Sequence, residues 1–229
     1  MTSVASGRAD RNDLDQPRAF GAMRLVHLDA SLVVINKPSG LHSVPAKPPG
    51  PQDCAEARVR AVFPEARSVH RLDRDTSGLM VYARSALAQR HLGWQFERRQ
   101  VSKGYVARVA GCVAGEAGRI DLPLACDWPN RPRQMVCRER GRAALTDWRV
   151  IAREADATRL ALAPHTGRSH QLRVHCLALG HPILGDPLYG DRAPGDAALG
   201  PRLQLHAERI GFRHPIGGAH VSFEVPTPF

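Results

Sequence analysis

The sequence predicts an α+β fold built on a largely antiparallel, mixed β-sheet flanked by helices and loops. Segments typical of strands outnumber segments typical of helices. Several of them follow one another with no helix between, which favours antiparallel pairing over βαβ units. The apolar fraction of 43% allows a substantial core. No apolar run approaches the ~20 residues that a membrane-spanning helix needs.

Turn-forming residues separate the expected elements. Strands are expected at 32–36, 79–83, 101–109, 144–151, 158–163, 203–210 and 219–225. Helices are expected at 53–63, 85–99 and 169–179. Asp53 and Ser85 suit the N-caps of the first two helices, Pro64 closes the first, and Gly180 suits the position after the third. In the strand at 101–109, alternate residues should share one face.

The chain shows no internal repeat and no interdomain linker, so we expect one domain over 23–229. Residues 1–22 have the composition of a disordered tail. They lack the apolar segment of a secretory signal, which favours a soluble cytoplasmic protein. The polar, basic segment 127–142 contains two prolines, and we expect a loop there with a contact function of its own.

The net charge of +10 favours a polyanionic partner, with nucleic acid as the first candidate. The abundance of Arg and Ala leaves open that genome composition accounts for part of this charge. Charge alone therefore does not settle the function.

Neither the cysteines nor the histidines have the spacing of a metal site. The five cysteines include no CxxC pair, and their odd number argues against a disulfide framework. His165, His170 and His175 are five residues apart, which places them on different faces of a helix or a strand. We therefore expect no catalytic metal and no cofactor.

The stretch from His70 to Gly78, HRLDRDTSG, is the most informative in the chain. It contains two arginines and two carboxylates within five residues, which are costly to bury unless they serve a site. A solvated turn with local ion pairs is the alternative for an arbitrary segment of this kind.

This stretch, continued as HRLDRDTSGLMV, resembles the signature of the RluA family of pseudouridine synthases. Three further segments resemble that family's motifs in the same order: NKPSG at 36–40, KGYVA at 103–107 and HTGRSHQLRVH at 165–175, the last followed by GHPI at 180–183 and GD at 185–186. The resemblance implies the pseudouridine synthase catalytic fold over 23–229 and an RNA-modifying isomerase. Its reaction cleaves the N1–C1′ bond of uridine, turns the uracil, and reattaches it through C5.

The resemblance makes Asp73 the essential carboxylate. One ionised carboxylate can act by covalent attack or by taking a sugar proton, and the sequence leaves both mechanisms open. Arg168 matches the arginine that holds this acid, and Tyr105 matches the active-site tyrosine, whose ring can stack on the uracil. Arg71 resembles the residue that fills the space left by a flipped base.

Other residues are expected to contact RNA. Leu172 and Arg173 should wall the uracil pocket and its approach. Basic residues that can follow RNA phosphates are Arg98, Arg99, Lys103, Arg131, Arg133, Arg138, Arg140 and Arg142. Some of these charges should be ordinary solvated side chains.

The segment 122–134 resembles one in the RluA branch of the family, which modifies a 23S rRNA hairpin and the tRNA anticodon stem-loop. About twenty residues precede the expected domain, so we expect no S4 RNA-binding domain. RNA is the expected partner. We expect the protein to be a monomer and not to bind a membrane. The rival classes are a non-catalytic RNA-binding module and a metal-dependent nuclease or hydrolase. Intact Asp73, Tyr105 and Arg168 speak against the first.

Overall fold

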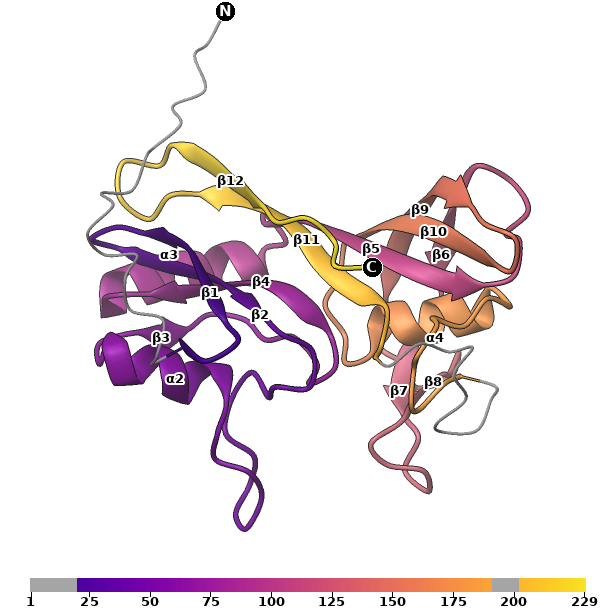
Figure 1. The fold of residues 1–229 in the computed structure, drawn as a ribbon, viewed down its shortest axis with the longest axis horizontal. Coiled ribbons are helices and arrows are strands. Elements are labelled where there is room, and N and C mark those ends of the chain that lie inside the picture. The colour runs from indigo at the N-terminus through magenta and orange to yellow at the C-terminus, as the bar shows by residue number, and fades with distance from the viewer. Residues whose placement is uncertain (1–19, 191–201) are drawn as a thin grey trace, which may run out of the picture.

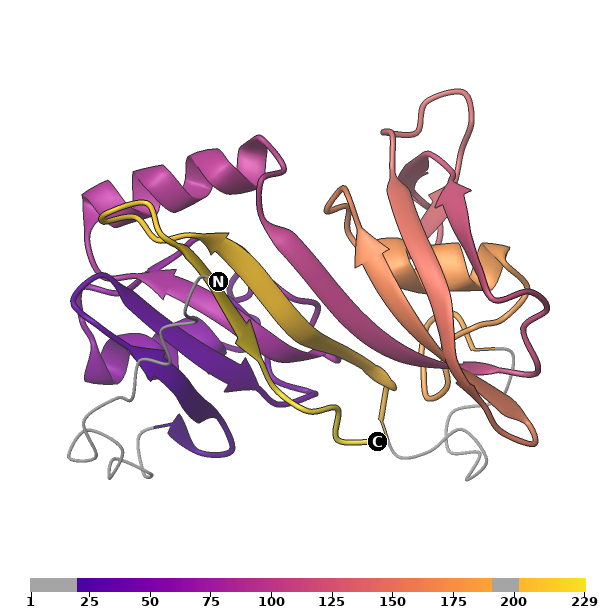
Figure 2. The same cartoon turned by 90° about the horizontal axis from the view of Figure 1, so that it is seen from above.

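The computed structural model describes residues 20–190 and 202–229, and one mixed β-sheet runs through both halves of the molecule (Figures 1 and 2). The strands are β1 Arg24–Leu28, β2 Leu32–Lys37, β3 Arg67–Ser68, β4 Ser77–Ala83, β5 Ser102–Ala110, β6 Ala117–Asp121, β7 Leu124–Cys126, β8 Gln134–Val136, β9 Leu145–Arg153, β10 Ala157–Pro164, β11 Leu205–Arg213 and β12 His220–Glu224. The helices are α2 Ala55–Val62, α3 Ala86–Glu97 and α4 Gln171–Ala178.

The main sheet has the order β1-β2-β4-β11-β5-β10-β9-β6, with β12 beside β11 and β3 beside β4. Only β4 and β11 pair in parallel; the other pairs between the described strands are antiparallel. β7 and β8 form a separate hairpin. The predicted α+β class with a largely antiparallel sheet is confirmed.

Each half of the sheet is covered by its own helices. In β2, Leu32 and Val34 pack toward α3, while Val33 and Ile35 pack toward α2. This strand is therefore buried on both faces, which explains its unbroken apolar run. In the other half, α4 packs Leu172 and Cys176 against β5, β9 and β10. Complete burial of one Leu, Ile or Val side chain contributes about 1.5–3 kcal/mol.

A glycine makes the parallel junction possible. Gly78, the second residue of β4, pairs with Ala207 of β11, and its φ is +118°. A Cβ on Gly78 would lie 2.3 Å from the Ala207 carbonyl oxygen. No other residue fits at this position without separating the two strands. The end of the HRLDRDTSG stretch is thus fixed where the two halves meet.

Several predicted boundaries were wrong. The N-cap of α2 is Cys54, whose Sγ accepts from the Ala57 amide at 3.3 Å. Asp53 instead forms two bonds with the Arg58 guanidinium, both 2.7 Å. The predicted tail extends too far, because Phe20 is buried. Residues 1–19 of that tail lie outside the described part of the chain.

Short strands were also missed. β1, β3, β6, β7 and β8 were not expected, and β8 lies inside the basic segment 127–142. In the part of the chain that the structure describes, no helix is long and apolar enough to cross a membrane.

Candidate active site

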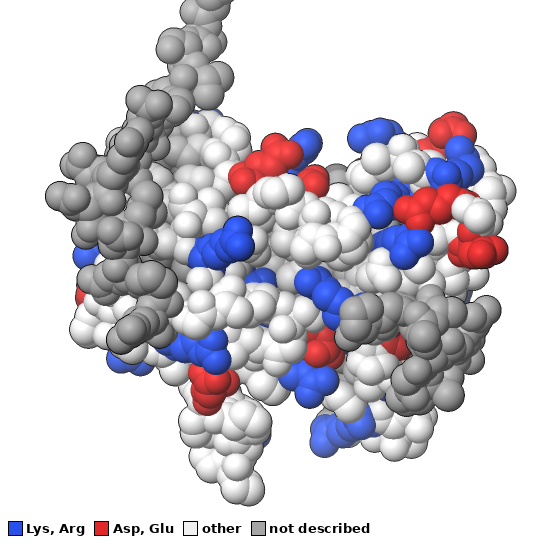
Figure 3. Space-filling view, in the orientation of Figure 1, with Lys and Arg blue, Asp and Glu red and all other residues white. Residues whose placement is uncertain are grey.

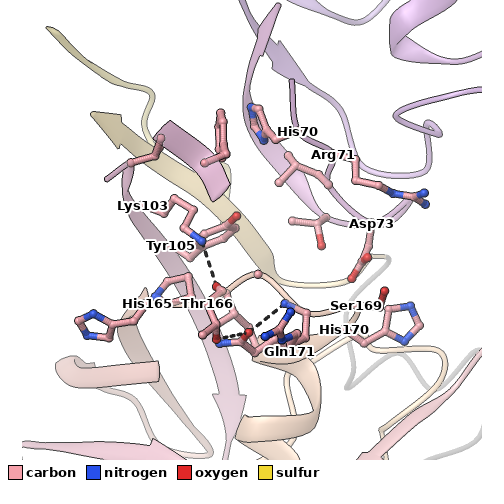
Figure 4. Close-up of a pocket in the computed structure, with 18 of the residues that line it drawn as sticks. His70, Arg71, Asp73, Lys103, Tyr105, His165, Thr166, Ser169, His170 and Gln171 are labelled. Atoms are coloured by element: carbon pink, nitrogen blue, oxygen red, sulfur yellow. Dashed lines mark hydrogen bonds between the residues drawn. The ribbon is translucent and has the colours of Figure 1, made fainter. Parts of the chain in front are cut away.

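A pocket of about 640 Å³ opens where the two halves of the sheet meet. Its walls come from residues 69–73, the end of α3, the start of β5 and the segment from 164 into α4. Figure 4 shows Asp73 on one side of this space and Tyr105 on the other, both with polar atoms facing the interior. Three of the four resembling segments therefore converge on one cavity.

Asp73 lies beside a buried arginine. The side chain of Asp73 is 26% exposed, and its Oδ2 is 3.8 Å from Nη1 of Arg173. Arg173 is 2% exposed and donates to both carboxylate oxygens of buried Asp186, at 2.7 and 2.6 Å. Burial opposes the charge of Arg173, but the bonds and charge of Asp186, together with Asp73, raise the pKa of the guanidinium. Asp186 thus fixes a permanent cation next to Asp73.

This geometry corrects the role expected of Arg168. Its Nε donates to the Ala143 carbonyl at 3.0 Å, and among the described residues it forms no ion pair with Asp73. Arg168 precedes α4, whereas Arg173 lies within it, on its buried side. The arginine that lies beside Asp73 is therefore Arg173, which we had assigned to the pocket wall and the RNA approach.

Tyr105 projects into the pocket from β5. Burial, together with the negative charge of Asp73, raises the pKa of the phenol well above its usual value. The hydroxyl therefore stays protonated at neutral pH. A neutral, half-buried ring beside the cavity is suited to stacking on a planar base.

Hydrogen bonds from Lys37 hold the loop that carries Asp73 in place. Lys37 is fully buried, and its ammonium donates to three carbonyls: Pro38 at 2.9 Å, Leu41 at 2.8 Å and Arg74 at 2.9 Å. Burial lowers its pKa to about 7, against the charges of the nearby carboxylates. The third of these bonds joins the NKPSG segment to the residue directly after Asp73. Sequence reasoning had given Lys37 no role, although a lysine at the end of an apolar strand was a visible signal.

Two serines add to this attachment. Ser43 Oγ donates to the Leu72 carbonyl at 2.6 Å and accepts from the Leu72 amide at 3.0 Å. Ser39 Oγ donates to the Asp75 carbonyl at 2.6 Å. The backbone on both sides of Asp73 is thus held in place, which keeps the carboxylate positioned without substrate.

Asp75 lies outside the pocket. Its side chain binds the Arg74 guanidinium at 2.9 Å. Arg71, in contrast, is exposed at the pocket edge and forms no ion pair with any described residue. In Figure 4 it extends away from Tyr105.

His70 is a pocket residue that sequence reasoning did not single out. Its Nε2 accepts from the Val81 amide at 3.0 Å, and its ring stacks on Phe96 with 4.8 Å between centroids. Burial, with a smaller effect from the charge of Lys103, lowers the pKa of His70 to about 4. The ring is therefore neutral at pH 7 and supports the pocket wall.

The other expected contact residues divide into two groups. Leu172 and Lys103 line the pocket, and Lys103 donates to the Thr166 carbonyl at 3.0 Å. Burial, with the nearby charge of Arg99, lowers the pKa of Lys103 to about 8. Arg131 and Arg133 lie outside this pocket, on the β7–β8 hairpin.

The three evenly spaced histidines do not converge. His165 binds Asp147 at 2.6 Å, His170 binds the Tyr189 hydroxyl at 2.7 Å, and buried His175 binds Thr146 at 2.9 Å.

A pocket with one positioned carboxylate, a fixed cation and a flanking aromatic ring can hold a planar base with its sugar against the carboxylate. These features define a class of enzyme that acts on a nucleobase and its glycosidic bond without a paired acid and base.

Comparison with known proteins identifies the class. Residues 31–178 match the family described as RNA pseudouridylate synthase. The dual-specificity RNA pseudouridine synthase RluA of Yersinia pestis is 50% identical over 208 residues, which cover 90% of this chain and 100% of that protein. The protein of the same name from Escherichia coli K12 is 49% identical over 206 residues, covering 90% and 93%.

Solved structures agree. Human RNA pseudouridylate synthase domain containing 1 superposes with a TM-score of 0.75 at 28% identity, covering 90% of this chain and 84% of the human chain. Human RNA pseudouridylate synthase domain containing 4 superposes with a TM-score of 0.72 at 26% identity, covering 89% of this chain and 88% of the human chain. The chain belongs to the RNA pseudouridylate synthase family. It is an isomerase that converts uridine in RNA to pseudouridine.

Proposed function

We propose that this enzyme modifies uridines in a 23S rRNA hairpin and in the anticodon stem-loop of tRNA, with Asp73 as its catalytic carboxylate. The observation that carries the mechanism is Asp73 at the mouth of the pocket, 3.8 Å from the buried cation of Arg173. The choice of RNA is supported by the segment 122–134, which resembles the RluA branch, and by relatives named as dual-specificity enzymes.

Asp73 acts as an anion against the sugar of the target nucleotide. Either it attacks C1′ as uracil leaves, or it removes a sugar proton so that the N1–C1′ bond breaks by elimination. In the first route uracil turns and C5 displaces the Asp73 oxygen from C1′; in the second, C5 bonds to C1′ as Asp73 returns the proton to the sugar. In both routes the proton on C5 is then lost and N1 gains one. The overall reaction is balanced with no water or oxidant consumed. Arg173 stabilises the charged carboxylate before the base is released.

Tyr105 supports the base during this rotation. Its ring lies across the pocket from Asp73 and stays neutral, so it can stack on uracil before and after it turns. Leu172 adds an apolar wall from α4.

Arg71 takes the place of the flipped base. The target must leave its stack before C1′ can reach Asp73, at a cost of a few kcal/mol. Arg71 is exposed and unpaired among the described residues, so its guanidinium can stack in the vacated space and bind phosphate.

Lys103, Arg131 and Arg133 add cationic contacts on the RNA side. The face shown in Figure 3 carries scattered basic side chains with acidic ones among them, rather than one continuous basic area. The basic residues around the pocket and the β7–β8 hairpin therefore define the RNA-binding surface better than the net charge does.

The proposed site of action is the cytoplasm, where rRNA and tRNA are modified. We propose that the enzyme acts as a monomer.

The test maps pseudouridine by chemical labelling in 23S rRNA and tRNA from cells with and without this protein. Loss of pseudouridine at one uridine in each RNA, restored by the wild-type gene, is the expected result. Purified enzyme should form pseudouridine on isolated stem-loops in the presence of a metal chelator. Unchanged maps for both RNAs would contradict the proposed substrates.

A further inference from the structure

A second groove adjoins the active-site pocket. It has a volume of about 430 Å³, within the roughly 300–1,000 Å³ typical of ligand sites. Arg142, Gly167, Arg168 and Ser169 line both cavities. Gly167 has no side chain where the two cavities adjoin, which leaves room for an RNA backbone to pass from one to the other.

An exposed aromatic ring marks the far side of this groove. Trp128 is 61% exposed and belongs to the turn of the β7–β8 hairpin. The Arg131 guanidinium lies 3.6 Å from the ring centroid. Arginine at this distance fixes the orientation of the indole through a cation–π contact and leaves the ring available to a second planar partner.

The hairpin turn is ordered by its own hydrogen bonds. Asn130 donates through its amide nitrogen to both carboxylate oxygens of Asp127 at 3.1 Å, and the Asp127 amide donates to the Arg133 carbonyl at 3.0 Å. The Gln134 amide donates to the Tyr189 hydroxyl at 2.7 Å, which ties the hairpin to the residues beside α4. These bonds therefore fix the position of the turn that carries Trp128.

The groove carries positive charge with no carboxylate to balance it. Arg140, Arg142 and Arg168 form no ion pair with any residue in the described ranges 20–190 and 202–229. Burial lowers the pKa of Arg168, and the charges of Arg142 and Arg99 lower it further. Arginines gathered in this way favour an anion between them.

We propose that this groove binds one nucleotide adjacent to the target uridine, with its base stacked on Trp128 and its phosphate held by Arg140, Arg142 and Arg168. This inference rests on the proposed function, because the neighbouring nucleotide belongs to the same RNA strand. The apolar floor formed by β7 suits a base, and the arginine rim suits the backbone. Arg168 then acts in binding the RNA rather than in holding Asp73.

Trp94 provides a matched control. It is 43% exposed on α3, and the Arg98 guanidinium lies 4.2 Å from its ring centroid. It lines neither cavity. Trp94→Ala therefore removes a similar Arg–Trp pair from the surface without changing the proposed subsite.

The experiment measures the dissociation constant of the tRNA anticodon stem-loop and of its variants with an abasic residue at each position next to the target. Trp128→Ala should weaken binding of the intact RNA by roughly 5- to 150-fold, the loss expected for one base–aromatic stack. Trp128→Phe should bind within about threefold of the wild type, because stacking tolerates a change of ring. Trp94→Ala should bind like the wild type.

Coupling identifies the nucleotide. At one neighbouring position, the abasic change should weaken the wild type but weaken Trp128→Ala no further. Arg142→Gln should lower the log–log salt slope by about 0.7–0.9, as one lost phosphate contact does. The inference is overturned if Trp128→Ala and Trp94→Ala have the same effect, or if every abasic change weakens the wild type and Trp128→Ala equally. Failure of the proposed function is a separate result, in which the wild type forms no pseudouridine in these RNAs.

Discussion

Replacing the buried Arg173–Asp186 pair distinguishes the arginine that holds Asp73 from the one that binds RNA. Arg173→Met alone leaves the carboxylate of Asp186 buried and unpaired, which should cost about 3–5 kcal/mol of folding stability. The double variant Arg173→Met/Asp186→Asn leaves no unpaired charge there. The side-chain oxygen of the asparagine at position 186 can still accept from the backbone amides of Leu188 and Tyr189, as Asp186 does at 2.9 and 3.1 Å. The double variant should therefore recover most of the lost stability.

The same double variant should not recover activity. Two unit charges about 4 Å apart interact by about 4 kcal/mol at the effective dielectric constant of a protein surface. Asp73 is 26% exposed, so solvent screens part of this energy. We expect single-turnover pseudouridine formation at saturating RNA to fall roughly 10²- to 10³-fold.

Arg168→Ala is the matched control. It should lower the affinity for RNA while its saturated single-turnover rate stays within about tenfold of the wild type. Melting curves of all variants separate loss of folding from loss of chemistry. The reasoning is refuted if the double variant turns over at the wild-type rate, or if Arg168→Ala loses more of the saturated rate than the double variant does.

Three further predictions concern the pocket and the loop that carries Asp73. Arg71→Ala should reduce turnover on a folded stem-loop more than it reduces binding, because the flipped base would lack a replacement; equal losses would reassign Arg71 to phosphate contact. Lys37→Met removes the ammonium donor from three carbonyls, of which that of Leu41 is buried, and should lower the free energy of unfolding by about 1–3 kcal/mol in urea denaturation; an unchanged midpoint would argue against the anchoring role. The pKa of His70 is about 4 in the folded protein and about 6.5 when unfolded, so its effect on stability should fall as pH drops through that window. His70→Gln should make the melting temperature less dependent on pH between 6.5 and 4, and an unchanged pH dependence would contradict a neutral His70 ring in the folded protein.

The sequence predicted the main strands well because their residues are buried in regular patterns. β2 and β4 read as apolar runs, and the α+β class followed from the succession of such segments. β6, β7 and β8 are short and half-exposed, so they lack a periodic signal. The parallel pairing of β4 with β11 joins distant parts of the chain. Its one local sign in the sequence is Gly78, where the two strands approach too closely for a side chain.

The site was predicted in composition but not in arrangement. Asp73, Tyr105 and Arg71 were selected because each lies in a segment that resembles a motif of the family, and the structure places all three at one cavity. They did not distinguish Arg168 from Arg173, because that choice depends on where α4 begins and which of its faces is buried. The partner that fixes Arg173, Asp186, lies in the GD segment beyond that helix, and no local pattern connects the two.

The most direct test of the mechanism compares Asp73→Asn with Asp75→Asn in single-turnover pseudouridine formation, beside a melting curve. Both carboxylates lie in the loop held by Lys37, but only Asp73 lines the pocket, whereas Asp75 pairs with Arg74. Asp73→Asn keeps the size of the side chain and removes its charge, so it should fold, bind RNA, and lose at least ~10⁴-fold in rate. Asp75→Asn should remain within roughly tenfold of the wild type. An active Asp73→Asn enzyme, or a stably folded but inactive Asp75→Asn enzyme, would contradict the assignment of Asp73 as the catalytic carboxylate.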